Sequence, residues 1–150
     1  MIHLIRTDST NLGFIKLVRM LDEELAIIDG DDHDFYDQYN GISDIKYAVV
    51  AFEDDLPVSC GAIKPIDEKT VEVKRMYTTP AVRGKGVASK VLAELEAWAS
   101  EMSFTQIILE TGKRQKDAVR LYEKNGYSVI ANYPPYVGVE NSVCFKKVLS

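Results

Sequence analysis

A glycine-rich segment from Arg83 to Ala88, with the sequence RGKGVA, is the part of the chain whose residue types and spacing most clearly indicate chemistry. Glycines allow a tight turn that brings backbone N–H groups close to a ligand. The segment follows a strand-like run and opens an amphipathic helix pattern, and the first turn of a helix offers unpaired N–H groups and the positive end of its dipole. It therefore predicts a backbone site for phosphate.

The charges around this segment also favour an anionic ligand. Between Tyr77 and Ala93 the sequence has no Asp or Glu, but it has Arg83, Lys85 and Lys90, in a chain of formal net charge −5. The segment lacks the Gly-Lys-Ser/Thr ending of a Walker loop and the third glycine of a dinucleotide fingerprint, so ATP and NAD are not indicated. An ordinary glycine turn before a helix is the alternative interpretation.

Length and composition restrict the class of protein. The 150 residues, 46% of them hydrophobic, predict one domain over 1–150 with its own core. Because there is no long apolar run and no charged-then-apolar leader, we expect a cytoplasmic protein that does not enter membranes. The pI of about 5.1 disfavours nucleic-acid binding. Cys60 and Cys144 lie in apolar strand-like runs, which favours reduced core thiols over disulfides.

The elements that must position the loop follow from hydrophobic periodicity and turn residues. We expect strands at residues 1–6, 45–52, 56–66, 70–78, 106–110, 127–131 and 142–148. We expect helices from a cap at residues 9–11 to about 28, from the acidic stretch 31–34 to near Asn40-Gly41, from 87 to 102, and from 115 to 124. Short polar linkers indicate an antiparallel meander, and the crossover through the third helix adds a parallel pair. The order βααβββαβαββ predicts an α+β fold with a mixed sheet.

Two motifs make the chain resemble the GNAT family of N-acetyltransferases. Arg83, Gly86 and Ala88 match the family pattern Arg/Gln-x-x-Gly-x-Gly/Ala, and residues 121–127, LYEKNGY, are similar to the family's Leu-Tyr-Glu-x-x-Gly-Phe/Tyr. The element order agrees over nearly the whole chain. The resemblance implies a central mixed, mostly antiparallel sheet of about seven strands, splayed between its fourth and fifth strands and flanked by four helices.

The same resemblance implies where acetyl-coenzyme A would bind. The coenzyme would lie in the splay, with backbone N–H groups of residues 82–87 on its pyrophosphate and an amide near Met76 polarising the thioester carbonyl. Many relatives carry Asn where this chain has Gln115, which offers the same amide one methylene further out. The coenzyme-binding residues implied are Met76, Thr78, Val82, Arg83, Gly84, Lys85, Gly86, Val87, Ala88 and Gln115.

Two side chains resemble the family's acid–base groups. Glu72, four residues before Met76 on the fourth strand, is similar to the general base that frees the attacking amine of its proton. Its alternative is an exposed strand carboxylate paired with Lys74 or Lys64. Tyr122 resembles the acid that protonates the departing thiolate, and its alternative is an aromatic packing residue at helical spacing. We expect Tyr127 in the core.

The part of the family's fold that binds the acceptor corresponds here to an acidic stretch, residues 29–34, and to the segment from Tyr133 to Tyr136. Asp32 and Tyr136 are the predicted substrate-binding residues, because a carboxylate and an aromatic face both suit a cationic amine. The acidic stretch could equally be a solvated helix start. It lacks the glycine and the distal Glu of an EF-hand loop, and the histidines are isolated, so no metal is expected.

We therefore expect an enzyme that transfers an acetyl group from acetyl-coenzyme A to a primary amine by direct attack in a ternary complex. A small-molecule or amino-acid-like acceptor is favoured, and Cys60 is expected to be core rather than a nucleophile. A non-catalytic acyl-coenzyme A sensor or scaffold, and an acetyltransferase acting on protein lysines or N-termini, are the alternatives. The family resemblance also suggests a homodimer. The sequence does not identify the acceptor.

Overall fold

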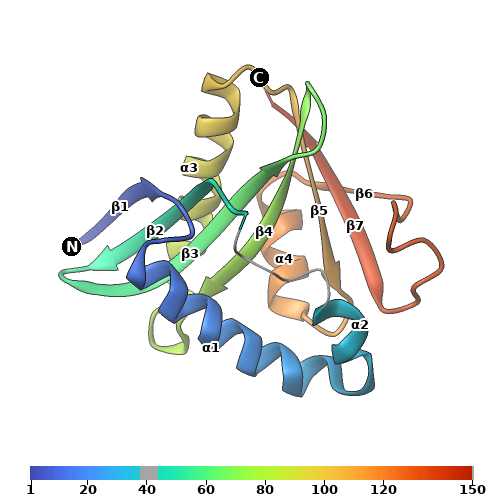
Figure 1. Ribbon diagram of the computed structural model, residues 1–150, viewed down its shortest axis with the longest axis horizontal. Coiled ribbons are helices and arrows are strands. Elements are labelled where there is room, and N and C mark those ends of the chain that lie inside the picture. Colours follow the sequence, from blue (N-terminus) through green and yellow to red (C-terminus); the bar gives the residue numbers. More distant parts are fainter. Residues whose placement is uncertain (38–43, 150) are drawn as a thin grey trace.

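The computed structural model describes residues 1–37 and 44–149, and its centre is a seven-stranded sheet in the order β1-β2-β3-β4-β5-β7-β6 (Figure 1). The strands are β1 Ile2–Thr7, β2 Tyr47–Glu53, β3 Leu56–Pro65, β4 Thr70–Thr78, β5 Gln106–Gly112, β6 Ser128–Ile130 and β7 Ser142–Val148. The α-helices are α1 Leu12–Asp29, α2 His33–Asp37, α3 Val87–Glu101 and α4 Lys116–Lys124, with short 3-10 helices at Gly30–Asp32 and Pro80–Val82. This mixed, mostly antiparallel sheet with its helices confirms the predicted fold class.

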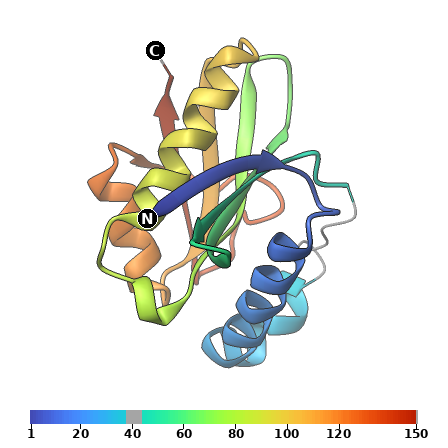
Figure 2. The same cartoon turned by 90° about the vertical axis from the view of Figure 1, so that its left-hand side faces the viewer.

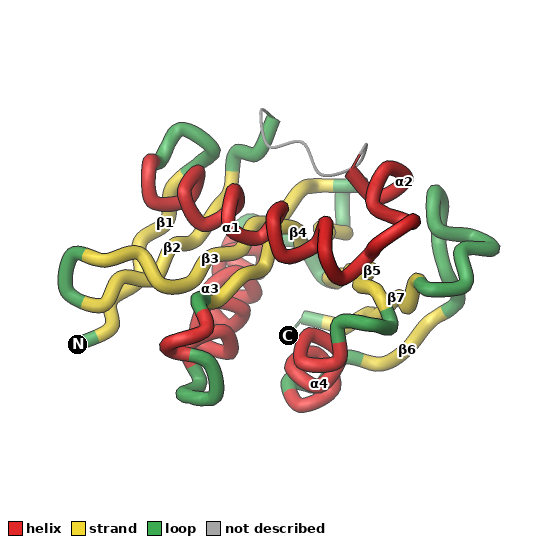
Figure 3. The backbone as a smooth tube through the Cα atoms, turned by 90° about the horizontal axis from the view of Figure 1, so that it is seen from below, coloured by secondary structure: helices red, strands yellow, loops and turns green. Residues whose placement is uncertain are grey.

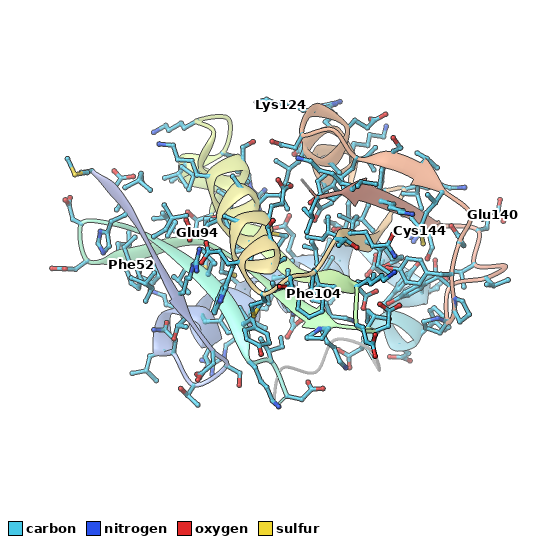
Figure 4. All side chains as sticks on the ribbon, turned by 90° about the horizontal axis from the view of Figure 1, so that it is seen from above. Phe52, Glu94, Phe104, Lys124, Glu140 and Cys144 are labelled. Carbon is cyan, nitrogen blue, oxygen red and sulfur yellow. The ribbon has the colours of Figure 1, made fainter. Side chains whose placement is uncertain are left out.

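The helices lie in two layers on opposite faces of the sheet (Figures 2 and 3). Helix α1 covers one face, where its apolar side chains pack on β2 and β3. Helices α3 and α4 cover the other face; Figure 4 labels Glu94 on α3 and Lys124 on α4. Because successive strand residues point to opposite faces, each strand sends alternate residues to each layer. The sheet therefore separates an α1 face from an α3–α4 face.

Helix α1 forms where the sequence predicts it. Asn11 is the N-cap residue, and its side chain accepts a hydrogen bond from the backbone N–H of Phe14 at 3.0 Å. The predicted apolar face is buried, as Phe14, Leu17 and Leu21 are each at most 7% exposed. Gly30 ends the helix with φ of 53°, a conformation that glycine takes without strain. The predicted end of the second helix near residues 40–41 lies outside the described residues.

Strands β4 and β5 pair only at one end and then diverge. Their parallel ladder joins Thr70–Glu72 to residues 106–108, and Glu72 opposite Ile108 is its last pair. Beyond that pair the two strands form the arms of a V, which opens toward the lower edge of Figure 1. The splay that the family resemblance implied is therefore present. Strand β5 continues along β7, which pairs with it antiparallel over its whole length.

A bulge in β4 lies on the first arm of the V. Cys60 pairs with Tyr77 and Ala62 with Lys74, which leaves Arg75 and Met76 opposite a single residue of β3. Arg75 takes a φ of 58°, which is strained for a residue with a Cβ and costs of order 1 kcal/mol. Its buried guanidinium is anchored by an ion pair with Asp22 of α1.

A close approach between strands explains the glycine opposite the bulge. A Cβ on Gly61 would overlap with the sulfur of Met76 and lie 3.0 Å from Leu95 of α3. Glycine at this position lets the Met76 side chain lie across β3, on the α3 face of the sheet. The bulged arm and α3 are thus packed directly against each other.

Candidate active site

A cavity of about 650 Å³ lies at the fork between β4 and β5. Its wall comes from the end of α1, both arms of the V, the loop before α3, and α4. The cavity crosses from the loop on the α3–α4 side to the face of the sheet that α1 covers. It therefore joins two chemically different ends. The loop end is formed by residues of the segment 82–88, and the acceptor end by the residues around Glu72, Glu110 and Tyr136.

The loop end contains the predicted glycine segment. Gly84 and Gly86 have φ of 79° and 81°, and Gly86 is the N-cap residue of α3. A Cβ added at either glycine would meet no atom within 4 Å, so open space lies directly above the backbone. A turn of this kind before a 15-residue helix is suited to an anionic group, because the helix start supplies N–H donors and a positive dipole end.

The basic side chains of this segment do not face the cavity as free cations. Arg83 donates hydrogen bonds to the Thr78 carbonyl and to Glu24 of α1, both at 2.8 Å, and its guanidinium lies 5.5 Å from the ring centre of Tyr77. Lys85 is exposed and is not part of the cavity wall. The loop end is therefore mainly a backbone site.

The other predicted coenzyme residues border the cavity. Met76, next to the β4 bulge, lies on the first arm of the V, and Gln115 lies at the N-terminus of α4. The Gln115 side-chain amide is close to Gly112, where an added Cβ would lie 3.3 Å from it. The remaining predicted residues in the wall are Thr78, Val82, Arg83, Gly84, Gly86, Val87 and Ala88.

Glu72 lies at the apex of the V and belongs to the acceptor end. It is only 7% exposed, and its Oε2 accepts a hydrogen bond of 2.6 Å from the Tyr133 hydroxyl. Its Oε1 is 3.6 Å from Lys74 Nζ, whereas Lys64 pairs with Asp44 instead. The alternative interpretation is thus met only in part, because Glu72 pairs with Lys74 but is buried rather than exposed.

Glu110 is a second carboxylate in the acceptor end, and sequence reasoning missed it. Burial raises the pKa of Glu110 to about 7, opposed by a hydrogen bond from Ser142 and assisted by the charges of Asp29 and Glu72. The Ser142 hydroxyl donates to Glu110 Oε2 at 2.7 Å. A signal was available, since Glu110 is a charged residue directly after the apolar run 107–109 of a strand that adjoins the expected splay.

A group of aromatic side chains lies beside these carboxylates. Tyr136, a predicted substrate residue, is buried in the cavity wall and stacks on Tyr36 with ring centres 6.5 Å apart. Tyr133 contacts Tyr136 edge-on at 5.8 Å. The Tyr36 hydroxyl lies 2.8 Å from Ser142 Oγ and accepts a hydrogen bond of 3.3 Å from Asn141. Tyr36 and Ser142 are site residues that the sequence did not assign, and Tyr133 belongs to the expected acceptor segment but was given no role.

Tyr122 borders the cavity from α4 and is 4% exposed. Its ring contacts Tyr127 edge-on at 5.6 Å and lies 5.9 Å from Phe145. Burial raises the pKa of the Tyr122 phenol, and the charge of Glu110 raises it further. The phenol therefore stays protonated near neutral pH, and both packing and proton donation are compatible with its position. Tyr127 is in the core, as expected.

The acidic stretch divides into two parts with different surroundings. Asp32 forms an ion pair with Arg114 at 3.0 Å and is not part of the cavity wall, whereas Asp29 is buried within it. Arg114 also donates a hydrogen bond of 3.0 Å to the Asp29 carbonyl. Arg114, in the loop before α4, thus connects that loop to the end of α1 and to the residues that follow it.

Both cysteines lie in the core, as expected. Burial raises the pKa of the Cys60 thiol to about 12, so it is protonated at neutral pH, and Cys144 is also buried. Within residues 1–37 and 44–149, no group of three His, Cys, Asp or Glu residues is arranged to hold a metal ion. None of the described helices is sufficiently long and apolar to span a bilayer.

Comparisons with known proteins agree with this geometry. The family model described as Acetyltransferase (GNAT) family matches residues 14–127. The uncharacterized N-acetyltransferase YjgM of Escherichia coli is 38% identical over 87 residues, which are 56% of this chain and 52% of that protein. The match thus spans about half the length of this curated relative.

Solved structures share the whole fold. A crystal structure from Klebsiella pneumoniae, named as an acyl-CoA N-acyltransferase, is 30% identical, with coverage of 100% of this chain and 99% of its own and a TM-score of 0.83. A GNAT family acetyltransferase from Elizabethkingia anophelis, solved with acetyl-CoA bound, has a TM-score of 0.68 at 16% identity and covers 99% of this chain and 98% of its own.

Proposed function

The chain belongs to the GNAT family of acetyltransferases, and we propose that it transfers the acetyl group of acetyl-coenzyme A to a primary amine. One observation carries this proposal. A continuous cavity joins an open glycine turn before α3 to a cluster of carboxylates and aromatic rings on the other face of the sheet. The first end suits a diphosphate, and the second suits an ammonium group.

The donor side rests on the backbone. N–H groups from residue 82 to residue 87 would bind the pyrophosphate, where the open space above Gly84 and Gly86 leaves room for it. The acetyl-CoA bound to the Elizabethkingia anophelis relative supports this choice of donor. A bulge leaves backbone groups without partners in the neighbouring strand, so the amide near Met76 is the proposed donor to the thioester carbonyl.

The chemistry requires protons to leave the nitrogen and a proton to reach the sulfur. The amine must lose a proton to a carboxylate of the acceptor end, for which Glu72 is the sequence candidate, before its nitrogen forms a bond to the acetyl carbon. As the carbon–sulfur bond breaks, Tyr122 gives its proton to the departing thiolate. Direct attack needs no covalent acyl-enzyme, and a buried, protonated Cys60 is a poor nucleophile for one.

The acceptor is proposed to be a small cationic amine. Asp29, Glu72 and Glu110 bring three carboxyl groups to the acceptor end, and Tyr36 and Tyr136 add ring faces. Carboxylates attract an ammonium group, and an aromatic face stabilises it by a cation–π contact. Asp32, outside the wall and paired with Arg114, is in a position to act only at the rim.

A thiol-release assay with acetyl-coenzyme A and a panel of amines tests the proposal. Wild type should release coenzyme A thiol only when a suitable amine is present. Tyr122→Phe should lower kcat by roughly 100-fold, the lower range for loss of a general acid, while calorimetry shows unchanged affinity for acetyl-coenzyme A. Tyr127→Phe, which removes a hydroxyl in the core, is the matched control and should retain kcat.

Two results would favour the alternatives. Tight binding of acetyl-coenzyme A without turnover on any amine or peptide would indicate a sensor or scaffold. Turnover confined to lysine peptides or free peptide N-termini would indicate a protein acetyltransferase. Absence of acetyl-coenzyme A binding at millimolar concentration would contradict all three functions.

A further inference from the structure

We propose that Glu110, rather than Glu72, accepts the proton from the acceptor amine, and that Glu72 is the carboxylate that binds the acceptor's ammonium form. This inference rests on the proposed acetyl transfer and assigns the roles of the two carboxylates in its acceptor end.

The two carboxylates lie at different depths in the V. Glu72 is in the last pair of the β4–β5 ladder, opposite Ile108, and so marks the apex. Glu110 is two residues further along β5, about 7 Å beyond the apex at the usual strand rise. Met76, beside the proposed donor to the thioester carbonyl, lies further out on the other arm. Glu110 is therefore nearer than Glu72 to the part of the V where the thioester would lie.

Both carboxylate oxygens of Glu72 have a partner among the described side chains. Tyr133 donates to one carboxylate oxygen at 2.6 Å, and Lys74 Nζ lies 3.6 Å from the other. Burial raises the pKa of the Tyr133 phenol, and the Glu72 charge raises it further, so this phenol remains a donor. The Tyr133 hydroxyl therefore fixes the orientation of the Glu72 carboxylate, which can attract a cation.

Glu110 has fewer stabilising partners. Among the described residues, the Ser142 hydroxyl is the one side chain that donates a hydrogen bond to it. Asp29 from α1 and Glu72 from β4 oppose its ionisation, whereas Lys74 from β4 favours it. The Arg114 guanidinium is directed elsewhere and pairs with Asp32. The other titratable neighbours are neutral, because burial and the charge of Glu110 raise the pKa of each; they are Tyr36 of α2, Tyr122 of α4 and Cys144 of β7.

These surroundings make Glu110 the better base at neutral pH. Burial is the largest cause that raises the pKa of Glu110 to about 7. A base accepts and releases protons most effectively when its pKa lies near the working pH. Two carboxyl groups whose environments separate their proton affinities commonly divide into a charged group and a proton carrier.

The position of Glu110 also connects its proton transfer with that of Tyr122. The charge of Glu110 is one of the two causes that raise the pKa of the Tyr122 phenol. The proposed base and the proposed acid therefore interact electrostatically. In the proposed step the ammonium gives one proton to Glu110, nitrogen bonds to the acetyl carbon, and the carbon–sulfur bond breaks as the thiolate takes the Tyr122 proton. The nitrogen gives its second proton to solvent as the amide forms. Glu110 then releases its proton to solvent, and Tyr122 is reprotonated from water.

A chain of hydroxyl groups holds Glu110 in place. Ser142 Oγ lies between the Glu110 carboxylate and the Tyr36 hydroxyl, at 2.7 and 2.8 Å, and Asn141 donates to Tyr36. Ser142 and Tyr36 are accordingly positioning residues. Removing the Ser142 donor takes away a contact that favours the charged form, so it should raise the pKa of Glu110.

The pH dependence of kcat/KM for the amine tests the proposal on the whole chain. Wild type should lose activity below about pH 7, and this loss is the acidic limb of its pH profile. Glu110→Gln should lower kcat by roughly 100-fold or more and abolish this acidic limb, whereas Glu72→Gln should mainly raise KM for the amine, about tenfold or more. Because the Glu72 charge raises the pKa of Glu110, the limb of Glu72→Gln should move to lower pH. In Ser142→Ala it should move to higher pH.

Affinity for acetyl-coenzyme A, measured by calorimetry, checks that each variant folds. The inference is overturned if Glu110→Gln keeps kcat and its acidic limb, or if Glu72→Gln is the variant that loses kcat. In either case the wild type still acetylates amines, so the proposed function survives. If wild type binds acetyl-coenzyme A but acetylates no amine, the proposed function fails and the division of roles fails with it.

Discussion

At the scale of the residue, Glu72 and Glu110 show how position changes the chemistry of identical side chains. Both project from strands at the fork, but Glu72 lies between Tyr133 and Lys74, whereas Glu110 lies near other carboxyl groups. Burial without a matching cation penalises the charged form of a carboxyl. We therefore expect Glu110 to affect stability as well as catalysis.

The pH dependence of unfolding follows from this residue. The pKa of Glu110 rises from 4.5 to about 7 on folding, so between these values the folded state holds a proton that the unfolded state releases. The stabilisation is complete below pH 4.5 and is lost as pH rises through about 7. We expect Glu110→Gln to be more stable than wild type at pH 8, by roughly 1 to 3 kcal/mol, and similar at pH 4. Urea unfolding at both pH values measures the difference.

Glu140 provides the control for this measurement. It is an exposed residue of the β6–β7 loop, which Figure 4 shows at the edge of the molecule. Glu140→Gln should change stability by a few tenths of a kcal/mol at most, equally at both pH values. A Glu110→Gln variant that is less stable than wild type at pH 8 would contradict the assigned pKa direction.

At the scale of the element, the turn before α3 depends on glycine for two reasons. The positive φ of Gly86 disfavours any Cβ, and the open space above it is where the diphosphate is proposed to bind. We expect Gly86→Ala to lose about 1 kcal/mol of stability and at least tenfold in affinity for acetyl-coenzyme A. Calorimetry and urea unfolding measure the two effects separately.

Gly138 separates backbone strain from ligand contact. It has φ of 79° and, like Gly86, no atom within 4 Å of an added Cβ, but it lies in the β6–β7 loop. Gly138→Ala should show a similar loss of stability with unchanged coenzyme affinity. Equal affinities for the two alanine variants would mean that the turn before α3 does not bind the coenzyme.

The contact between β3 and the β4 bulge yields a second prediction at this scale. Gly61→Ala places a Cβ where the Met76 sulfur lies, so we expect a loss of about 1 to 3 kcal/mol from overpacking. Met76→Ala vacates that space while keeping the backbone amide. The cost of Gly61→Ala should therefore be much smaller in a Met76→Ala background, as a double-mutant cycle of unfolding free energies would show. Additive losses would exclude this contact as the cause.

At the scale of the whole molecule, the cavity wall draws on α1, β4, β5 and α4, which lie on both faces of the sheet. We propose that residues 1–150 unfold as one domain, because these layers share the sheet between them. A ligand that contacts so many elements stabilises only the folded state. Calorimetric melting should show one transition, raised by acetyl-coenzyme A at 100 times its Kd by about 2.7 kcal/mol of unfolding free energy. Two transitions, with only one ligand-dependent, would argue for separate units.

The homodimer and the cytoplasmic location stay predictions. Strands β1 and β6 are the two edges of the sheet, and Val129 on β6 is 63% exposed. An exposed edge can pair with a second copy. Sedimentation of wild type and Val129→Lys would show whether such pairing occurs, since a lysine on the edge disfavours it.

Local patterns in the sequence were enough to place the elements and the glycine turn. Periodicity predicts the buried face of α1, and the segment from Arg83 to Ala88 needs only its own glycines and the helix that follows. Motif spacing likewise indicated Tyr122 and the splay. These features depend on contacts within a few residues, or on a family pattern, so they can be read along the chain.

The surroundings of the acceptor end were decided by the tertiary structure. Tyr36 and Ser142 are 106 positions apart, and Tyr133 and Glu72 are 61 apart, yet each pair is within hydrogen-bond distance. Such contacts depend on strand order, on register and on how α1 and α2 pack over the fork. Burial by those layers, which no local pattern measures, also raises the pKa of Glu110. The sequence thus determined the chemical groups, and the packing of distant segments decided which of them share a site and in what protonation state.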